Sequence, residues 1–434
     1  CVPQRPGAPA LGGVGLELEV FPVAVGDGGA PAGRLRLSET VAVLDTAVPR
    51  SATGDGVPRW SLPGGGRLVP EPGGQVEHVT PVHRGVGAAL DDLAAGAAVL
   101  AAAFGSGRRQ VVLASAGLDV WHPVASVAQQ LAAARYPAMA AYLARRGPMG
   151  RVMMCHTCAL QVNLDLGPPA VAVERWRVAL LVAPLLVATF AASPVPAGLN
   201  GRSLAWQALD PTRTGFPRRF LAGDDDPVAV IADAALAADV MLVRRPGGAV
   251  PGRPGWRFGS WLRDGDAEHG RPTADDLDYH LTTLFHEVRA RGFLEVRSVD
   301  ALPARWRAAP VTLLAGLVYD DRARHAVLSL LERHRRRLPQ LLARAAVSGV
   351  ADPALCALTV EAWSFALAGA GRLGPGYLAP SQLRATEAFL ERFTLRGRCP
   401  ADELRACLTE SATAALAWAS DPLETAAATA ERSR

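Results

Sequence analysis

Four short segments of the chain alternate aliphatic residues with carboxylates, amides or arginine. They cover residues 16–20, 75–77, 161–165 and 294–297. Alternation with a period of two predicts β-strands, and side chains two positions apart share one face of a strand. The leucines and valines of these segments would therefore face a core, and the polar side chains would share the opposite face.

The shared polar faces collect acidic side chains. Glu17 lies with Glu19, Gln75 with Glu77, Gln161 with Asn163 and Asp165, and Glu295 with Arg297. If the four strands are neighbours, the clustered carboxylates repel one another and take up protons unless a cation lies among them. Hard oxygen ligands in this number suit Mg²⁺, which usually binds together with substrate phosphates. The pattern predicts an enzyme that uses a nucleotide on an open sheet.

The rest of the chain mixes strands with helices at first and then becomes helical. We expect further strands at 34–37, 40–44 and 111–115, and helices at 88–104, 124–134, 136–146 and 173–192. Beyond Pro303 the expected helices cover 307–319, 322–337, 339–346, 353–369, 380–395 and 401–418. This order favours an α+β fold over repeated βαβ units. We expect one catalytic domain over residues 1–420, helical from about residue 303, and a flexible tail at 421–434.

Composition narrows the classes of function. The chain has 434 residues, 50% hydrophobic and 20% charged, so a sizeable core is possible. Its net charge of +4 is spread along the chain, which argues against nucleic acid as the main partner. All 45 basic residues are arginine, which excludes the lysine chemistry of P-loop proteins, protein kinases and pyridoxal-phosphate enzymes. If ATP binds, metals and arginines must hold its phosphates.

The cysteines and the apolar segments suggest no export or membrane function. Cys155 and Cys158 form the only close pair among six cysteines, and a zinc site would need a second pair or suitably spaced histidines. We therefore expect buried thiols. The run 178–192 contains Pro184 and is too short to span a bilayer. The N-terminus shows no signal-peptide pattern, so we expect a cytoplasmic protein without membrane contact.

Longer strings around these strands resemble the glutamate–cysteine ligase family, in its plant-type and actinobacterial branch. The strings occur in the family's order at 15–19, 71–77, 135–139, 153–154, 161–165, 200–203, 210–215, 280–285, 287–289 and 294–297. The string at 396–402 is similar to the ergothioneine-pathway members of the family. Any one string is a weak signal, but the complete ordered set over roughly residues 13–405 is specific.

The resemblance implies a fold and an activity. The fold would be a glutamine-synthetase-like saddle, in which a curved and mostly antiparallel sheet holds ATP, metals and amino acids. ATP would convert the γ-carboxylate of glutamate to an acyl phosphate, and the amine of cysteine would displace the phosphate to give γ-glutamylcysteine for ergothioneine. Both steps need the triphosphate charge neutralised and the reacting groups held in line.

The resemblance also implies roles for individual residues. The Mg²⁺ ligands would be Glu17, Glu19, Glu71, Glu77 and Glu295, with Gln161 as a further candidate. The substrate-binding set would be Arg135, Tyr136, Asn163, Arg202 and Arg213, in which Arg135 and Arg202 hold glutamate. The planar fork of arginine suits a carboxylate because it makes two hydrogen bonds. Glu17, Glu19, Glu295 and Arg297 would act directly in catalysis, and Arg213 and Arg297 would also meet phosphate.

Three departures from the family leave the amine acceptor open. The chain has residues 78–80 as His-Val-Thr where the family usually has Leu-Ser-Gly, Ala192 where it has Asn, and His286 where it has Pro. One alternative is therefore a related ligase that uses another amine, because unpaired polar groups in a pocket control selectivity. Another is an inactive binding relative, which the intact carboxylates disfavour. We expect a monomer that acts on small molecules.

Several of these residues also have purely structural interpretations. A pair of glutamates on one strand is usually a solvated face, and Arg135 could lie at a helix end. His280 could pack within its own helix, Asn163 and Asp165 could cap a loop, and the basic run 333–337 would be a solvated helix end.

Overall fold

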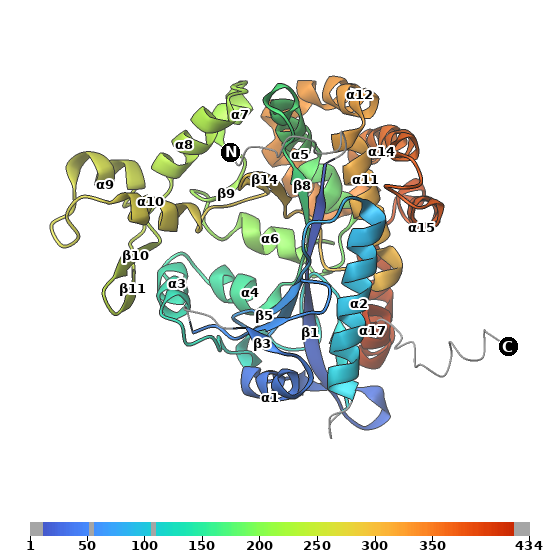
Figure 1. Cartoon of the computed structure of the whole chain (residues 1–434), viewed down its shortest axis with the longest axis horizontal. Coiled ribbons are helices and arrows are strands. Elements are labelled where there is room, and N and C mark those ends of the chain that lie inside the picture. The colour runs from blue at the N-terminus through green and yellow to red at the C-terminus, as the bar shows by residue number, and fades with distance from the viewer. Residues whose placement is uncertain (1–11, 52–55, 106–109, 421–434) are drawn as a thin grey trace.

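The strands that carry the acidic residues are neighbours in one antiparallel sheet. This computed structural model describes residues 12–51, 56–105 and 110–420, and its main sheet has the order β13-β14-β8-β1-β6-β5-β4-β3 (Figure 1). The strands are β1 (Val14–Val25), β3 (Arg50–Ser51), β4 (Arg59–Ser61), β5 (Arg67–Pro70), β6 (Val76–Val79), β8 (Leu160–Asp165), β13 (Val288–Ala290) and β14 (Phe293–Val296). The four alternating segments thus give four adjacent strands, β14, β8, β1 and β6.

The long strand β1 organises the sheet. Its first half pairs with β6 and β8, and its second half pairs with β2 (Pro31–Arg34) and β7 (Val111–Ala114). Leu16 and Leu18 of β1 are buried, as are Val162 and Leu164 of β8. One face of the sheet is therefore apolar, as the alternation predicts, and the opposite face is left for polar side chains.

Helices cover the apolar face of the sheet. They are α2 (Val86–Gly105), α5 (Pro169–Thr189) and α11 (Ala308–Tyr319), which contact the sheet or one another and share its core. By length and composition alone, α2 and α14 (Pro353–Leu373) could cross a membrane, but core helices pass the same test. Here α2 packs on β1 and β7, and α14 packs on α11 and on the next helix, α12 (Asp321–Leu331).

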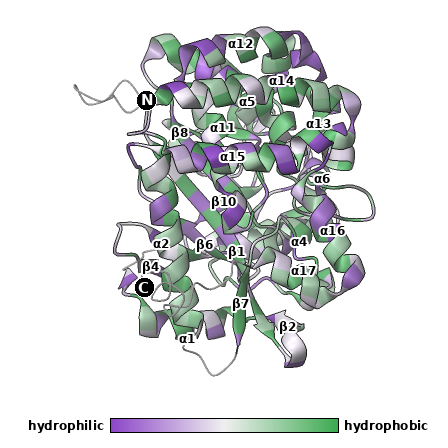
Figure 2. Cartoon of the chain, turned by 90° about the vertical axis from the view of Figure 1, so that its right-hand side faces the viewer, coloured by the Kyte–Doolittle hydropathy of each residue, from purple (hydrophilic) through white to green (hydrophobic). Residues whose placement is uncertain are grey.

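The C-terminal part is helical from residue 304; Figure 2 shows most of its helices in the upper part of the molecule and the last two lower, beside β1. After η3 (Ala304–Trp306) and α11 come α12 (Asp321–Leu331), η4 (Glu332–Arg337), α13 (Leu338–Ser348), η5 (Gly349–Ala351), α14, α15 (Pro380–Arg392) and η6 (Thr394–Arg396). The helix expected at 401–418 is divided into α16 (Pro400–Glu410) and α17 (Ala412–Ala419). Ser411 causes the break, because its hydroxyl accepts a hydrogen bond from Ala414 N and starts a new helix.

A second group of short elements lies on the side of the sheet away from α2 (Figure 1). It contains α7 (Arg218–Ala222), α8 (Pro227–Ala237), the hairpin β10 (Leu242–Arg245) and β11 (Gly248–Pro251), α9 (Phe258–Asp264) and α10 (Ala274–Leu281). Two short strands, β9 (Thr214–Gly215) and β12 (Phe285–His286), pair in parallel between this group and the sheet. The chain then enters β13 and β14.

Three local expectations are wrong. The strand expected at 34–37 is not formed, because β2 ends at Arg34 and a helix begins at Leu37. Residues 40–44 belong to the helix α1 (Leu37–Ala47), whose start is capped because Glu39 accepts a hydrogen bond from Arg36 N. Residues 124–134 form only the short 3-10 turn η2 (Val124–Ser126) and irregular chain. The backbone there is bonded elsewhere, since Gln130 N donates to Pro72 O. The expected helix 136–146 is present as α3 (Arg135–Ala144), followed by α4 (Met149–His156).

The overall class agrees with the expectation. Helices and a mostly antiparallel sheet form separate layers, which is the α+β arrangement. Cys155 and Cys158 are free and buried, as expected, and burial raises the pKa of Cys155 to about 11. The predicted flexible tail, 421–434, lies outside the described residues.

Candidate active site

The polar face of the sheet brings the predicted side chains together. The register places Glu19 opposite Glu77 across β1 and β6, and Glu17 opposite Gln161 across β1 and β8. Glu295 lies opposite Asn163 across β14 and β8. Directly opposed residues have Cβ atoms about 5 Å apart, so these side chains form a continuous row over four strands.

Glu71 joins this row through the turn between β5 and β6. Glu71 O accepts a hydrogen bond from Gly74 N at 2.9 Å, and Gly74 has a φ of 82° that favours glycine. A Cβ on Gly73 would lie 2.4 Å from Cys155 Cα, so α4 packs directly on the turn. Gln75 does not join the row, because its side chain bonds Gly73 N and Thr157 O within the protein.

The carboxylates of this row are crowded. Burial, followed by the charge of Glu19, raises the pKa of Glu71 to about 8. Burial and the charge of Glu71 raise the pKa of Glu77 well above its usual value, and burial also raises that of Glu19. Within the part of the chain that the structure describes, neither Glu71 nor Glu77 accepts a hydrogen bond through its side chain. These groups therefore need either protons or a cation.

An oxygen-only donor set of this kind fits Mg²⁺. The four glutamates at 17, 19, 71 and 77 are half-buried and face one side of the sheet. Over residues 12–51, 56–105 and 110–420, no three His, Cys, Asp or Glu side chains form a ready-made metal cage. Mg²⁺ commonly takes only one or two protein carboxylates and completes its shell with phosphates and water, so an open row is compatible with it.

Glu295 behaves differently from the other glutamates. It is fully buried, and its carboxylate accepts hydrogen bonds from Arg289 Nε at 2.9 Å and from an Arg297 guanidinium nitrogen at 2.6 Å. Burial alone would raise its pKa, but Arg297 and Arg289 together lower it to about 2. In this arrangement both oxygens are occupied by arginine. Glu295 anchors two arginines here, and its expected role as a Mg²⁺ ligand stays a prediction that would require one of these bonds to open.

Arg297 links the row of glutamates to a neighbouring pocket. Its guanidinium also donates to Gln161 Oε1 at 2.6 Å and lies over the ring of Trp206, 5.5 Å from the ring centroid. Gln161 is thus engaged by Arg297, and its use as a metal ligand would require that bond to break. The carbonyl of Arg297 accepts a hydrogen bond from Arg202 at 2.9 Å.

Arg202 is positioned by the short helix α6 (Gly201–Gln207). Asn200 caps this helix, because its side-chain oxygen accepts a hydrogen bond from Ser203 N at 2.8 Å. A Cβ on Gly201 would meet Leu118 at 2.5 Å, which explains the glycine. Arg202 is buried, and its Nε has no hydrogen-bond partner among the described residues.

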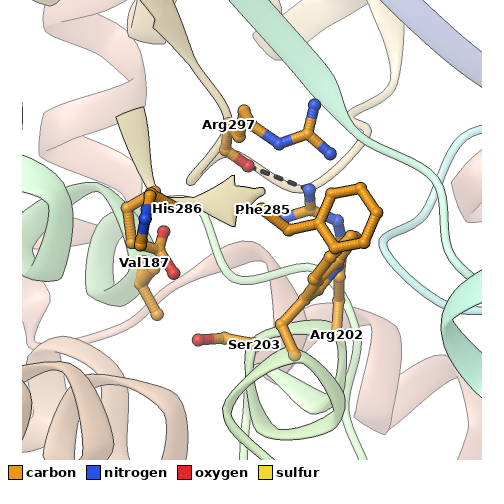
Figure 3. A pocket seen from close by; sticks show the side chains of 8 residues that line it. Val187, Arg202, Ser203, Phe285, His286 and Arg297 are labelled. Atoms are coloured by element: carbon orange, nitrogen blue, oxygen red, sulfur yellow. Dashed lines mark hydrogen bonds between the residues drawn. The ribbon is translucent and has the colours of Figure 1, made fainter. Parts of the chain in front are cut away.

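A pocket opens between α6, β12 and β14 (Figure 3). Arg202, Trp206, Phe285, His286, Glu287 and Arg297 line it. Figure 3 shows Arg202 and Arg297 together on one side and His286 on the other. The pocket and the row of glutamates share Arg297, so they form one continuous site with acids at one end and arginines near the other.

Three further predicted residues lie near this site. Arg135 is half-buried at the start of α3 and donates to Thr282 Oγ1 at 3.2 Å. Its charge offsets a small part of the rise in the pKa of Glu71. Tyr136 packs on the neighbouring apolar cluster. Asn163 donates from its amide to Glu17 Oε1 at 2.9 Å, so it orients that carboxylate. Their roles toward a substrate stay predictions.

Arg213 is engaged by other residues inside the protein. It is fully buried, and it donates to Asp210 Oδ2 at 2.8 Å, to Thr283 O at 2.9 Å and to the carbonyl of Asp239. Its neighbours therefore satisfy the guanidinium inside the protein. Arg213 therefore fixes the loop after α6 to the segments that follow α10 and precede β10. Its expected substrate and phosphate roles stay predictions that would require these bonds to open.

The structure also adds residues that the sequence patterns did not single out. Arg289 pairs with Glu295, Trp206 covers Arg297, and Glu287 lines the pocket. Arg289 and Glu295 lie opposite each other in the β13–β14 hairpin. The sequence could have predicted this pair, because polar and aliphatic residues alternate in Glu-Val-Arg-Ala at 287–290, just before the hairpin turn. Nothing local in the sequence indicated Trp206.

Comparison with known proteins places this site in a family context. The family model "Glutamate-cysteine ligase family 2 (GCS2)" matches residues 13–420. The glutamate–cysteine ligase EgtA of Mycolicibacterium smegmatis is 36% identical over 403 residues, which cover 91% of this chain and 86% of that protein. The chloroplastic glutamate–cysteine ligase of Arabidopsis thaliana is 33% identical over 207 residues, which cover 45% of this chain and 38% of that protein.

Two solved structures share the fold. A glutamate–cysteine ligase of Francisella tularensis in complex with AMP has a TM-score of 0.52 at 13% identity, and covers 97% of this chain and 91% of that one. A bifunctional glutathione synthetase of Pasteurella multocida has a TM-score of 0.52 at 12% identity, and covers 94% of this chain and 52% of that one. At these identities the likeness concerns the fold alone.

Proposed function

Because the chain belongs to Glutamate-cysteine ligase family 2, we propose that it joins L-glutamate to L-cysteine at the expense of ATP. The product would be γ-glutamylcysteine, formed through γ-glutamyl phosphate and supplied to ergothioneine synthesis. The observation that carries this proposal is the row of crowded glutamates that ends at Arg297 and the arginine-lined pocket. The name of the M. smegmatis relative, a glutamate–cysteine ligase, supports the choice of substrates.

The residues of the row would hold the metal and the phosphates. Glu17, Glu19, Glu71 and Glu77 are the proposed ligands of Mg²⁺, which when bound neutralises phosphate charge and polarises the transferring phosphoryl group. A bound cation would attract these glutamates and so offset their mutual repulsion, which lowers their pKa values and favours the charged forms. With no lysine in the chain, arginine provides the remaining positive charge.

The arginines would hold the substrate in line for transfer. Arg202 and Arg297 line the pocket that adjoins the row, and their planar guanidinium groups suit carboxylates and phosphates. Glu295 and Arg289 keep Arg297 in place through the buried ion pairs. Arg135 lies at the other side of the row, near Glu71, where it would meet the substrate or the nucleotide.

A different amine acceptor is the second candidate function, and of the departures from the family that suggest it only one lies at the pocket. His78 and Ala192, two of the positions that depart from the family, are buried in packing: a Cβ on Gly96 of α2 would lie 2.2 Å from His78 Cε1, and Ala192 N donates to Asp300. Thr80 bonds Leu16 N. Only His286 lines the pocket. Among these positions, therefore, only His286 is placed to meet a substrate in this pocket.

Phosphate release from ATP with Mg²⁺, glutamate and each candidate amine tests the proposal, with products identified by mass spectrometry. Release that needs both glutamate and cysteine, with a γ-glutamylcysteine mass, is the expected result. Release with glutamate and another amine would select the second function. No release with any amine would leave the inactive relative. Sedimentation or light scattering would test the monomer that we also propose, and fractionation its cytoplasmic location.

Glu17→Gln tests the metal assignment. We expect at least a 100-fold loss of phosphate release with an unchanged circular dichroism spectrum, because one metal-binding charge is removed. Glu268→Gln is the matched control, since the Glu268 side chain is 81% exposed and far along the chain from the row. Near-normal turnover of Glu17→Gln would refute the assignment of Glu17.

A further inference from the structure

His286 lines the arginine-lined pocket and carries an unused hydrogen-bond acceptor, its buried Nε2 atom. Strand β12 pairs in parallel with β9, and this pairing sets His286 opposite Gly215. The His286 Nδ1 atom lies 3.1 Å from Gly215 O. A carbonyl oxygen only accepts, so Nδ1 carries the proton and Nε2 has a free lone pair. Among the described residues, Nε2 has no partner.

His286 stays neutral in its surroundings. Burial lowers its pKa to about 4, and the charges of Arg213 and Arg289 act in the same direction. Glu287 is its chain neighbour, and Arg202 and Arg297 line the same pocket. At neutral pH the ring therefore offers an acceptor at Nε2 and no positive charge.

Glu287 supplies a second acceptor in the same pocket. One of its carboxylate oxygens accepts a hydrogen bond from Ser298 Oγ at 2.6 Å, and its backbone carbonyl accepts one from Arg297 N at 3.0 Å. The second carboxylate oxygen has no hydrogen bond from the residues that the structure describes. Glu287 and His286 are thus consecutive acceptors on one wall, while Arg202 and Arg297 are donors on another.

The free space and the charge of the pocket match one chemical group. The free volume is about 10 Å³, close to the minimum for one group of the size of water. An ammonium group has that size and carries three N–H donors, which Glu287 and His286 can accept. Arg202 lies 3.7 Å from Asp300 and Arg297 lies 2.6 Å from Glu295, so buried carboxylates balance both arginines. Glu287 is the remaining acid of the lining; burial raises its pKa, and an ammonium group bound beside it would favour its charged form.

We propose that His286 and Glu287 bind the α-ammonium group of the acidic amino acid that the enzyme activates, while Arg202 and Arg297 face its carboxylates. This inference rests on the proposed ligase function and assigns the specificity of its donor site. A dicarboxylic acid without the amino group would leave the Glu287 carboxylate unpaired in the pocket, which is the situation in which a polar site rejects an analogue strongly.

Binding measured without turnover tests the inference. The full chain, with Mg²⁺ and a non-hydrolysable ATP analogue, is titrated with glutamate and with glutarate, which lacks the α-amino group. We expect the wild type to prefer glutamate. Glu287→Gln should weaken glutamate binding by about 10–100-fold and change glutarate binding less than about 3-fold, because only glutamate loses a charge-assisted hydrogen bond.

A second pair of variants separates recognition from folding. His286→Ala removes the acceptor and should weaken glutamate binding, whereas His286→Gln keeps an acceptor oxygen and should restore part of it. In turnover, these variants should raise the KM for glutamate more than they lower kcat. Glu268→Gln again serves as the control, with an unchanged ratio.

Three results would overturn the inference: a wild type that does not prefer glutamate, a glutamate/glutarate ratio unchanged in Glu287→Gln and His286→Ala, or a KM increase confined to the amine acceptor. If Glu287→Gln does not fold, the two His286 variants decide. Failure of the ligase proposal would appear separately, as absence of phosphate release by the wild type with every amine.

Discussion

At the scale of single residues, the glutamates of the site divide into two kinds. Glu71 and Glu77 lie among other carboxylates and have raised pKa values, while the pKa of Glu295 is about 2. The difference follows from the neighbours, because all of these side chains experience burial and only Glu295 is paired with arginines. Crowded carboxylates suit a cation that arrives with the substrate, and a paired carboxylate suits a permanent scaffold.

Glu295→Gln should therefore lower stability as well as activity. The neutral amide leaves Arg289 and Arg297 without their buried anion, and we expect a loss of about 3 kcal/mol in the free energy of unfolding. Urea unfolding followed by fluorescence measures it, with Glu17→Gln as the comparison that should change stability much less. Equal stability of Glu295→Gln and wild type, with turnover abolished, would instead favour a direct catalytic role for Glu295.

At the scale of elements, Arg213 connects segments that are far apart in the chain. It lies after α6 and bonds one residue that follows α10 and one that precedes β10. Asp210, its partner, is also fully buried and accepts a hydrogen bond from Tyr142 of α3. The arrangement of β9 and β12 beside the pocket depends on this cluster, since Phe285 N donates to Arg213 O.

Arg213→Ala should destabilise this group of elements. Removal of the guanidinium leaves Asp210 buried without its ion pair, for which we expect a cost of about 3–5 kcal/mol. Hydrogen exchange should show faster exchange over residues 210–285 than in wild type, and Arg213→Lys should be intermediate because it keeps the charge but loses the planar fork. A stable Arg213→Ala protein with a strongly raised KM for glutamate would support the substrate role.

The sequence predicts the strands better than the elements around them. The alternation around Glu17, Gln161 and Glu295 identifies a two-faced strand because burial on one face dominates over local propensity. The segments 40–44 and 124–134 could not be assigned in this way, because distant groups decide their conformation. Gln130 bonds the turn at Gly73 and the first residue of α1, and Arg151 bonds Val127 O.

The predicted site residues divide along the same line. Residues on the strands, such as Glu19 and Glu77, could be predicted from the period-two alternation. The strand register then places them opposite each other. Arg213 has a sequence context that fits the family pattern. Apart from Asp210, three residues away, its partners lie 26 to 71 residues away, so only the tertiary structure shows that its donors are used. The basic run 333–337 also differs from the expected solvated helix end, since Arg335 is buried and pairs with Asp225.

At the scale of the whole molecule, buried histidines couple stability to pH. Burial lowers the pKa of His78 and of His280 to about 4. Both values lie below the usual 6.5, so between about pH 4 and pH 6.5 the unfolded chain binds more protons than the folded protein. Their contribution is fully present above pH 6.5 and is lost as the pH falls towards about 4, by up to about 3 kcal/mol for each histidine at the acid end.

Thermal unfolding between pH 7.5 and 4.5 should show this loss of stability, and His78→Leu should make stability depend less on pH. The raised pKa of Glu71 acts in the opposite direction between about pH 8 and 4.5, so the difference between wild type and variant isolates the histidine contribution. His325→Asn is the control, because the His325 side chain is 61% exposed. A slope unchanged in His78→Leu would show that His78 is protonated without cost.

The central position of β1 has a consequence for how the chain is made. This strand emerges first, but its partners β6, β7 and β8 follow over the next 140 residues, and β14 completes the polar face only at residue 296. During synthesis the early strands therefore have unpaired edges until the later strands are made, and unpaired edges promote aggregation. Assembly of the site depends on the last third of the chain, so nascent chains that stop before β14 should be clients of chaperones and proteases.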